Sequence, residues 1–380
     1  MTKKVLSLFL VAVLAISLFA GCTPKNEEPE AQQDAQQEET KDNEQGEAQE
    51  EPQKEEDEFK VGFVTDVGGI DDKSFNQGTW EGVVKYAEEK SWEQGKQYTY
   101  IQSNEEADYI PNLSAFGDDK YNVVVAAGFK FFNSMNEVAP QFPDTNFAII
   151  DSIVDQPNVA SVMFAEEQGS FLVGVAAAKA TKTNKVAFIG GEDSELIRHF
   201  HAGFEAGVYA VDPSMEIISQ YAGAFDNPGA GQQIASTMYE QGVDIIYHAA
   251  GGTGNGVINE AKNRVDNGEE VWVIGVDRDQ YEDGIYDKDN NKSVILTSML
   301  KRVGVASYDM VKAAQDGNFP GGEVISLTLA DDGVGIPGEN PNLDDDIIKV
   351  IEEYKEKIVN EEIVVPNNMD DLETFKSNLK

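Results

Sequence analysis

The segment VGFVTDVGGIDDKSFNQGTWEGV, Val61 to Val83, opens as an apolar, β-rich run and closes as a helical stretch. Between the two lie Asp, Gly, Ser and Asn residues, which favour a polar loop. In open parallel sheets, ligands bind in the crevice at the carboxyl ends of the strands, where such loops begin. The segment therefore predicts an α/β fold with a ligand-binding junction at this point.

Apolar runs alternate with helical stretches along the rest of the chain, which is typical of βαβ units and parallel sheets. The predicted strands form two sets of four, which begin near Val61, Tyr98, Tyr121 and Asn146, and near Val186, Met215, Asp244 and Val271. A chain of 380 residues also exceeds the size of a single core. We expect two α/β lobes.

The two sets align with each other after a shift of 125 residues. The matching positions are Val61, Phe63, Phe75, Gly78, Gly82 and Val83 in the first set, and Val186, Phe188, Phe200, Gly203, Gly207 and Val208 in the second. The repeat predicts that the first helix of each lobe begins with a Phe, and that its glycines pack the helix closely on the sheet.

Later segments predict a hinge. Residues 159–182 and 292–316 each read as a crossing strand followed by a helix, the first of which closes the first lobe and passes into the second. Residues 342–360 predict a last amphipathic helix. The expected division is a first lobe over 59–165, completed by C-terminal crossover segments, and a second lobe with the hinge crossovers over 166–380.

The N-terminus indicates export. Lys3 and Lys4 precede an apolar run over 5–20, and small residues lead to Cys22, the only cysteine. This resembles a bacterial lipobox, with Phe19 where Leu is usual, and it implies a signal peptide over 1–21 and a lipid anchor on Cys22. An uncleaved membrane anchor is the alternative. Either way the remainder lies outside the cytoplasm, and a single cysteine excludes an intrachain disulfide.

Residues 22–58 predict a disordered, acidic tether. From Thr23 to Glu58 there are 15 acidic residues against three lysines, and almost no apolar side chain. The whole chain has a formal net charge of −40, which argues against nucleic-acid binding because phosphate contacts need a basic surface.

The strand ends of both lobes are expected to converge on one cleft between them. These strand-end residues are Asp66, Gly128, Asp151, Gly190, Gly191, Gly251, Gly252 and Asp277. Together with Phe75 and Phe200 they predict a flat ligand between aromatic rings, with carboxylates that accept hydrogen bonds from hydroxyl groups. Phe225 is a competing stacking residue, and Lys301 either reaches the cleft or caps a sheet.

Rival motifs match poorly. Counting an EF-hand loop from Asp66 places Gln77 where Glu is needed. The stretch TDVGGIDD resembles the calcium-binding start of nucleoside hydrolases, but Val64 stands where that pattern has an Asp. The run GGTGNG, 251–256, lacks the third glycine of a dinucleotide loop and reads as backbone donors at a helix start. His199, His201 and His248 lack metal-site spacing. We therefore expect no catalytic group, no metal and no cofactor.

Several longer stretches together resemble a known family, the basic membrane protein family of substrate-binding lipoproteins, similar to its purine nucleoside receptors. The resemblance begins near Lys60 and runs to the C-terminus, and it is carried by TDVGGIDDKSFNQGTWEGV, EADY, NFAIID, NVASVMFAEEQGSFLVGVAAAKATK, RHFHAGFEAGV, VDPS, YAG, AGGTGNGV and VWVIGVDRDQ.

The resemblance implies a two-lobed type I periplasmic-binding-protein fold that presents purine nucleosides to the permease of an ABC importer at the cell membrane. It implies that the base lies between Phe75 and Phe200, and that Asp66, Asp151 and Asp277 hold ribose and base edges. Asn76 and Lys301 are the implied polar partners, and Gly251 lines the cleft. A receptor for another small ligand on the same fold, such as a sugar or an autoinducer, is one alternative. A nucleoside hydrolase is another.

Overall fold

The computed structural model describes residues 58–379. The predicted signal peptide, Cys22 and all but the last residue of the predicted tether lie outside the described residues. Among residues 58–379, no helix combines the length and the apolar character needed to cross a membrane.

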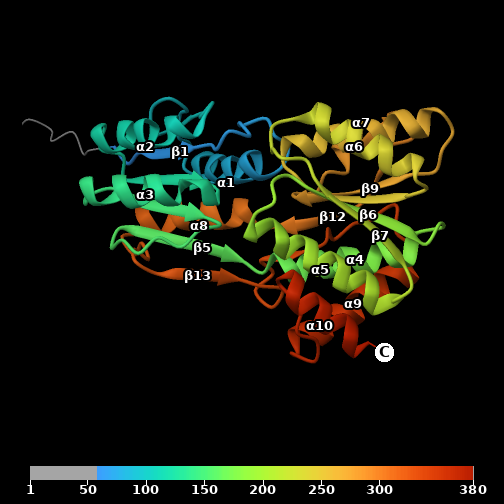
Figure 1. The fold of residues 1–380 in the computed structure, drawn as a ribbon. Helices are drawn as coiled ribbons and strands as arrows, with labels where there is room; N and C mark the ends of the chain where they lie inside the picture. Colours follow the sequence, from blue (N-terminus) through green and yellow to red (C-terminus); the bar gives the residue numbers. More distant parts are fainter. Residues whose placement is uncertain (1–57, 380) are drawn as a thin grey trace, which may run out of the picture. The chain divides into compact units, whose positions relative to one another are not determined.

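The first of two lobes is built on a six-stranded sheet of order β13-β5-β4-β3-β1-β2 (Figure 1). All neighbouring strands in it are parallel. Its strands are β1 (Val61–Val64), β2 (Tyr98–Ile101), β3 (Val123–Ala127), β4 (Asn146–Ile150), β5 (Val159–Phe164) and β13 (Val324–Leu327).

The second lobe has a six-stranded sheet of order β14-β12-β9-β8-β6-β7, parallel except for the edge strand β14. Its strands are β6 (Lys185–Gly190), β7 (Glu216–Tyr221), β8 (Ile245–Ala249), β9 (Trp272–Asp277), β12 (Ile295–Lys301) and β14 (Val334–Gly335). A small hairpin joins β10 (Ile285–Asp287) to β11 (Lys292–Ser293). All eight predicted strands are therefore present, and the predicted α/β architecture with two parallel sheets is confirmed.

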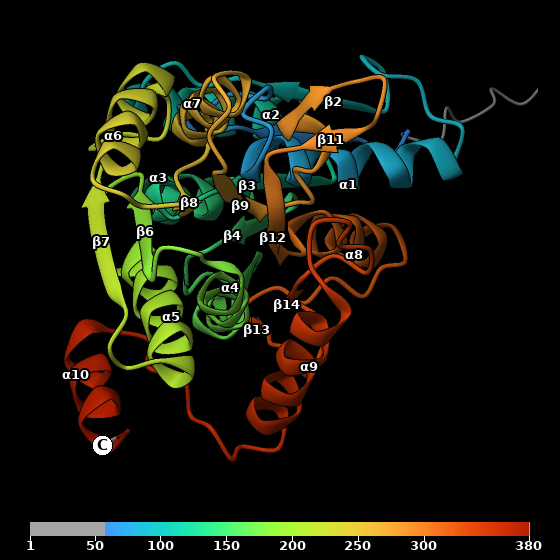
Figure 2. The ribbon, with the colours of Figure 1, turned by 90° about the vertical axis from the view of Figure 1, so that its right-hand side faces the viewer.

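Helices cover both faces of each sheet (Figures 1 and 2). The first lobe has α1 (Phe75–Glu89), α2 (Tyr109–Asp118), α3 (Phe132–Val138) and α8 (Val303–Gln315). The second lobe has α4 (Glu166–Ala180), α5 (Glu195–Val211), α6 (Pro228–Glu240), α7 (Gly252–Asp266), α9 (Asp345–Val359) and α10 (Met369–Asn378). The predicted amphipathic helix is α9, and α10 is a further helix that the sequence analysis did not identify.

Alternation along the strands explains the layers. In β1, Phe63 belongs to the core beneath α1, whereas the next residue, Val64, belongs to the core beneath α2 and α3. Successive side chains of a strand point to opposite faces, and here both faces are covered. This is why the strands read as continuous apolar runs, such as the fully buried VVVAA of β3.

The chain passes between the lobes three times. β5 completes the first sheet, and α4 after it packs against α5 in the second lobe. β12 belongs to the second sheet, and α8 after it packs against α1 in the first lobe. The third passage joins β13 to β14, so that residues 303–327 are part of the first lobe.

The repeated glycines bring helices together, and the predicted packing of these glycines on the sheets is wrong. A Cβ atom on Gly82 would lie 2.0 Å from the carbonyl oxygen of Gly304 in α8. A Cβ atom on Gly207 would lie 2.1 Å from the carbonyl oxygen of Phe171 in α4. Each lobe thus uses glycine to seat its first helix against the backbone of a crossover helix.

The first helix of the second lobe does not begin at Phe200, which corrects a second prediction. α5 begins at Glu195, because the Ser194 hydroxyl oxygen accepts a hydrogen bond from the N–H group of Ile197 at 3.3 Å and caps the helix. Phe200 therefore lies in the second turn. In the first lobe the prediction is correct, since α1 begins at Phe75.

Candidate ligand-binding site

A cavity lies where strand ends and helix starts of both lobes meet. The first lobe contributes Asp66, Gly68, Asp72, Phe75, Asn76, Gly128, Phe129 and Asp151. The second contributes Leu196, Ile197, Phe200, Phe225, Ala249, Ala250, Gly251, Gly252, Val276, Asp277 and Lys301. The structure thus brings eight of the predicted site residues to one cavity: Asp66, Phe75, Asn76, Asp151, Phe200, Gly251, Asp277 and Lys301. Gly128 and Gly252 of the predicted strand-end set also line it, whereas Gly190 and Gly191 do not, which corrects that part of the prediction.

The first-lobe wall is organised by Asp72. Its buried carboxylate accepts hydrogen bonds from the N–H groups of Ser74, Asn76 and Gln77 at 2.8–3.0 Å, and so caps α1. It also accepts one from the side-chain amide of Asn76 at 3.1 Å. Asp72 therefore fixes both the start of the helix and the orientation of Asn76.

Asn76 in turn holds Asp66. Its Nδ2 donates to Oδ1 of Asp66 at 2.7 Å, and its Oδ1 accepts from the N–H group of Asp66 at 3.1 Å. Burial raises the pKa of Asp66 to about 6, although hydrogen bonds from Asn76 and Gly68 act in the opposite direction. Asp66 is thus a fixed acceptor whose charge changes just below neutral pH.

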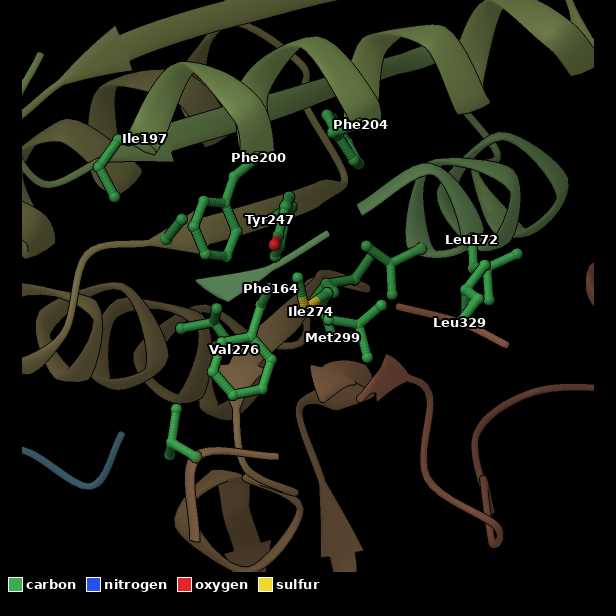
Figure 3. Close-up of a cluster of buried hydrophobic side chains, with 14 of the residues drawn as sticks. Phe164, Leu172, Ile197, Phe200, Phe204, Tyr247, Ile274, Val276, Met299 and Leu329 are labelled. Carbon is green, nitrogen blue, oxygen red and sulfur yellow. The ribbon is translucent and has the colours of Figure 1, made fainter. Parts of the chain in front are cut away.

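Aromatic rings of both lobes surround the Lys301 ammonium group. Its Nζ lies 5.3 Å from the ring centroid of Phe75, 5.4 Å from that of Phe200 and 5.2 Å from that of Phe164. Figure 3 shows Phe200 and Ile197 on α5, and Phe164 and Val276 below them in this view. Phe75 and Phe200, from opposite lobes, therefore lie around one point of the cavity.

Lys301 also links buried carboxylates. Nζ lies 2.6 Å from Oδ2 of Asp151 in the first lobe and 2.9 Å from Oε1 of Glu166 at the start of α4. Burial alone would lower the pKa of Lys301, but the two carboxylates raise it above the ordinary value. The ammonium group therefore stays charged and ties both lobes to a crossover helix.

Asp151 and Asp277 occupy equivalent places at the ends of β4 and β9. Both have left-handed backbone conformations, with φ of 67° and 66°, which are uncommon outside glycine and concentrate at functional sites. Burial raises the pKa of Asp277 to about 6 and also raises that of Asp151, against the attraction of Lys301 in both cases. Oδ2 of Asp277 accepts a hydrogen bond from the Ser74 hydroxyl across the lobes.

One acceptor in the cavity is unused. Within residues 58–379, Oδ1 of Asp151 is buried and has no hydrogen-bond partner. A buried oxygen of this kind costs free energy unless a donor satisfies it. The floor of the cavity thus offers a hydrogen-bond acceptor to a ligand.

Glycine forms the cavity wall where the backbone requires it. Gly128 has φ of 119°, and a Cβ atom there would lie 3.3 Å from Oδ2 of Asp66. Gly251, with φ of 54°, precedes the first turn of α7, as the GGTGNG motif predicts.

Sequence reasoning missed two parts of the wall. Asp72 lies in the quoted segment but was not among the predicted site residues, although the free N–H groups at a helix start favour an acidic side chain there. The other part is the apolar surface of Leu196, Ile197, Ala249, Ala250 and Val276. Only tertiary packing distinguishes these residues from ordinary core residues.

The three histidines have different partners and do not form one site. His201 pairs with Tyr221 at 2.8 Å and Glu205 at 2.9 Å, and His248 is buried, which lowers its pKa to about 4. Nδ1 of His199 lies 3.7 Å from Oε2 of Glu166. With Glu167 these two form the one group of metal-ligand type among the described residues, and it does not include the aspartates of TDVGGIDD.

Two lobes joined by three crossings, with a cavity at the strand ends, define the type I class of periplasmic binding proteins. Solved structures agree with this class. The fold matches a solute-binding protein of an ABC transporter system from Aeropyrum pernix with a TM-score of 0.73 and 28% identity, over 84% of this chain and 97% of that one. The predicted fold class is therefore confirmed.

Within this class, residues 59–369 match the family model of PnrA-like ABC transporter substrate-binding proteins, and the chain belongs to this family. A Listeria monocytogenes relative, named CD4+ T-cell-stimulating antigen, is 47% identical over 81% of this chain and 88% of its own length. The nucleoside-binding protein BmpA of an ABC transporter in Lactococcus lactis is 35% identical over 97% of this chain and all of its own length. These proteins are named for binding or antigenicity and not for catalysis.

Proposed function

We propose that this substrate-binding protein captures purine nucleosides, among them guanosine, inosine and adenosine, and presents them to the permease of an ABC importer. The observation that carries the proposal is the meeting, in one cavity, of Phe75 and Phe200 from opposite lobes with an unpartnered oxygen of Asp151. A purine needs flat apolar faces, and a ribose needs hydrogen-bond acceptors. The cavity offers both.

In the proposed complex, the base lies between the rings of Phe75 and Phe200. Stacking of a base on an aromatic side chain contributes on the order of 1–3 kcal/mol and tolerates different bases. Asp66, held by Asn76, faces the same cavity and can accept hydrogen bonds from the edge of a base. Gly128 and Gly251 leave room for a planar ligand to approach the backbone.

The ribose hydroxyls are assigned to the buried carboxylates. Hydroxyl groups donate to ionised carboxylates in charge-assisted hydrogen bonds, which are the stronger kind. Asp151 offers its free oxygen, Asp277 stands at the equivalent strand end, and Lys301 can donate to a hydroxyl oxygen. The same groups explain why no phosphate is expected in the cavity, since carboxylates outnumber the single ammonium group in its lining.

The proposal includes the location of the protein. A lipid on Cys22 would anchor the chain at the outer face of the cell membrane, and the acidic tether would hold the folded lobes away from the lipid surface. Mass spectrometry of the membrane fraction tests the anchor: a diacylglycerol adduct on a chain that begins at Cys22 is expected, and an unmodified Met1 would contradict it.

Ligand identity is tested first by mass spectrometry of small molecules that co-purify with residues 58–380. Calorimetric titration with guanosine, inosine, adenosine, cytidine and ribose follows. A bound purine nucleoside is the expected result, and binding of ribose alone would favour the sugar-receptor alternative. Prolonged incubation with inosine should return it intact, because release of free hypoxanthine would indicate a hydrolase.

The role of Asp277 is tested by comparing ribosides with free bases. Asp277→Ala should weaken guanosine binding by about 1.5–3 kcal/mol, the usual worth of a charged hydrogen bond, and change guanine binding little. Asp279→Ala, an exposed neighbour, is the matched control. Equal losses for guanosine and guanine would place Asp277 away from the sugar.

A further inference from the structure

The lobes also meet beside the cavity, at the loop between β1 and α1. The side-chain amide of Asn255 in α7 donates to the carbonyl oxygen of Asp72 at 3.0 Å. The side-chain amide of Gln280, which follows β9, donates to the carbonyl oxygen of Lys73 at 3.0 Å. Neither amide lines the cavity, so these two bonds join the lobes without any place in the ligand site.

The acceptor side of this contact is rigid. The Asp72 carboxylate is fixed by the N–H groups of α1, so its own carbonyl group has a defined direction. Lys73 has φ of 58°, a left-handed conformation that turns its carbonyl group toward the second lobe. The first lobe thus presents two consecutive carbonyl oxygens to the second lobe.

The donor side is equally fixed by contacts within the second lobe. Gln280 is fully buried, its Oε1 accepts from the N–H group of Val276 at 2.9 Å, and its own N–H group donates to Ser298 at 3.1 Å. Asn255 follows Gly254, where a Cβ atom would lie 2.2 Å from Nδ1 of the buried His248. This close approach holds the first turn of α7 against β8.

We propose that Asn255 and Gln280 are positioning residues that form an interlobe latch, which sets the affinity for every ligand by stabilising the closed lobes. The proposal rests on the nucleoside-binding function above, and it concerns residues that do not touch the ligand. Both partners are ordered within their own lobe, so closing the latch orders few additional groups.

The latch bonds affect the ligand affinity through the fraction of molecules that are closed. When only the closed form binds tightly, the apparent dissociation constant equals the intrinsic constant divided by the closed fraction. A neutral hydrogen bond contributes modestly because water replaces the lost partner in the open form. Loss of either latch bond should therefore raise the dissociation constant roughly three- to tenfold. The factor should be the same for guanosine and inosine.

The sharpest variants are Asn255→Asp and Gln280→Glu. Each keeps the shape of the side chain and replaces the donating amino group by an oxygen that faces a carbonyl oxygen. Gln280→Glu also keeps the oxygen that accepts from Val276, so that the contact within the second lobe survives. Asn259→Asp is the matched control, because it makes the same change at an exposed position of the same helix.

Lobe closure is measured by electron spin resonance distances in the full-length chain. Cys22 is the only cysteine, so Cys22→Ser leaves a background for spin labels at Ala107→Cys in the first lobe and Asp226→Cys in the second, both exposed. Wild type should show a short, closed distance that increases in population with guanosine. Both latch variants should lose closed population with and without guanosine, and the control should match wild type.

Three results would contradict the latch, and a fourth would contradict the proposed function. Latch variants with the distances and dissociation constants of Asn259→Asp would overturn the latch, as would a wild type that shows only an open distance. A loss that differs between guanosine and inosine would also overturn it, because it would indicate direct ligand contact. If guanosine binds to none of the proteins, the proposed function fails, and the ligand-free distances still decide whether the latch exists.

Discussion

In each lobe, one segment leads from the end of the first strand to a phenylalanine of the cavity, and the two segments differ in structure and polarity. In the first lobe, β1 ends at Val64 and an irregular polar loop leads to Phe75. In the second lobe, β6 ends at Gly190, and the chain is already helical at Glu195, five residues before Phe200. The first segment therefore presents carboxylates to the cavity, whereas the second presents Leu196 and Ile197.

The comparison shows that the helix-packing glycines of the repeat have the same role in both lobes, whereas the residues near the cavity differ. Gly82 and Gly207 keep the same helix contact in both lobes, because a side chain at either place meets backbone atoms. Asn76 has His201 as its counterpart 125 residues later, and His201 turns away to Tyr221 and Glu205. The repeat therefore preserves the helix contacts, while the two segments that lead into these helices present different chemistry to the cavity.

The largest expected effect is on the free energy of unfolding and follows from the loss of Lys301, which contacts Asp151 and Glu166. Lys301→Met leaves Asp151 and Glu166 buried without their cation, and it should lower the free energy of unfolding by about 3–5 kcal/mol. Urea denaturation measures it. Lys182→Met is the control, because Lys182 pairs with Glu270 at 2.8 Å on the exposed surface and its loss should cost less than about 1 kcal/mol. Equal losses would contradict the special place of Lys301.

The next effect tests the shared frame. Gly82→Ala and Gly207→Ala should each lower the free energy of unfolding by about 1–3 kcal/mol or more, since each Cβ atom would force two helices apart. Gly338→Ala adds a Cβ atom with no neighbour within 4 Å and should be nearly neutral. Thermal unfolding of the three variants decides the point. A loss in only one lobe would break the equivalence of the two helix pairs.

A smaller effect tests the equivalence of the rings. Phe75→Leu and Phe200→Leu keep an apolar side chain and remove a stacking surface, and each should weaken nucleoside binding by about 1–2 kcal/mol. Calorimetric titration measures the loss, at a temperature at which the variants and the wild type are all folded. A large loss at Phe75 with none at Phe200 would mean that only the first-lobe ring stacks on the base, and Phe225→Leu would then be the informative comparison.

The smallest effect is a pH dependence of binding. Burial raises the pKa of Asp66 and of Asp277 to about 6, so both take up protons as the pH falls through 6. Ligand hydroxyl and N–H donors favour the charged form, so affinity should be lost on the acid side, by roughly tenfold between pH 7.5 and pH 5. Titrations in buffers of different ionisation enthalpy should show proton release on binding near pH 6. Constant affinity over this range would remove both carboxylates from direct contact.

Strands and strand-end residues were predictable from the sequence because both depend on local pattern. Continuous apolar runs mark strands that are buried on two faces, and parallel strands bring their carboxyl ends to one edge. Asp66, Asp151 and Asp277 could therefore be placed at one cavity without coordinates.

What the sequence did not reveal depends on contacts between distant segments. The glycine face of α1 packs on α8, which begins more than 200 residues after α1 ends. The glycine face of α5 packs on α4, the helix that precedes it in the chain. The start of α5 was predicted at Phe200 from the repeat alone, and Ser194, whose hydroxyl oxygen caps the helix, was not used in that prediction. Nothing in the sequence around Asn255 and Gln280 indicates that their amides donate to carbonyl groups of the other lobe.

The crossing of the chain between lobes has a consequence for the order of folding. α1 needs α8 to cover its glycine face, and the first sheet needs β13 at its edge, yet residues 303–327 follow nearly all of the second lobe. A nascent chain that ends near residue 300 has neither lobe complete, so it exposes an uncovered helix face and an open strand edge. The two lobes must therefore mature together, and a chain cut in the hinge should yield fragments that aggregate and not one stable half.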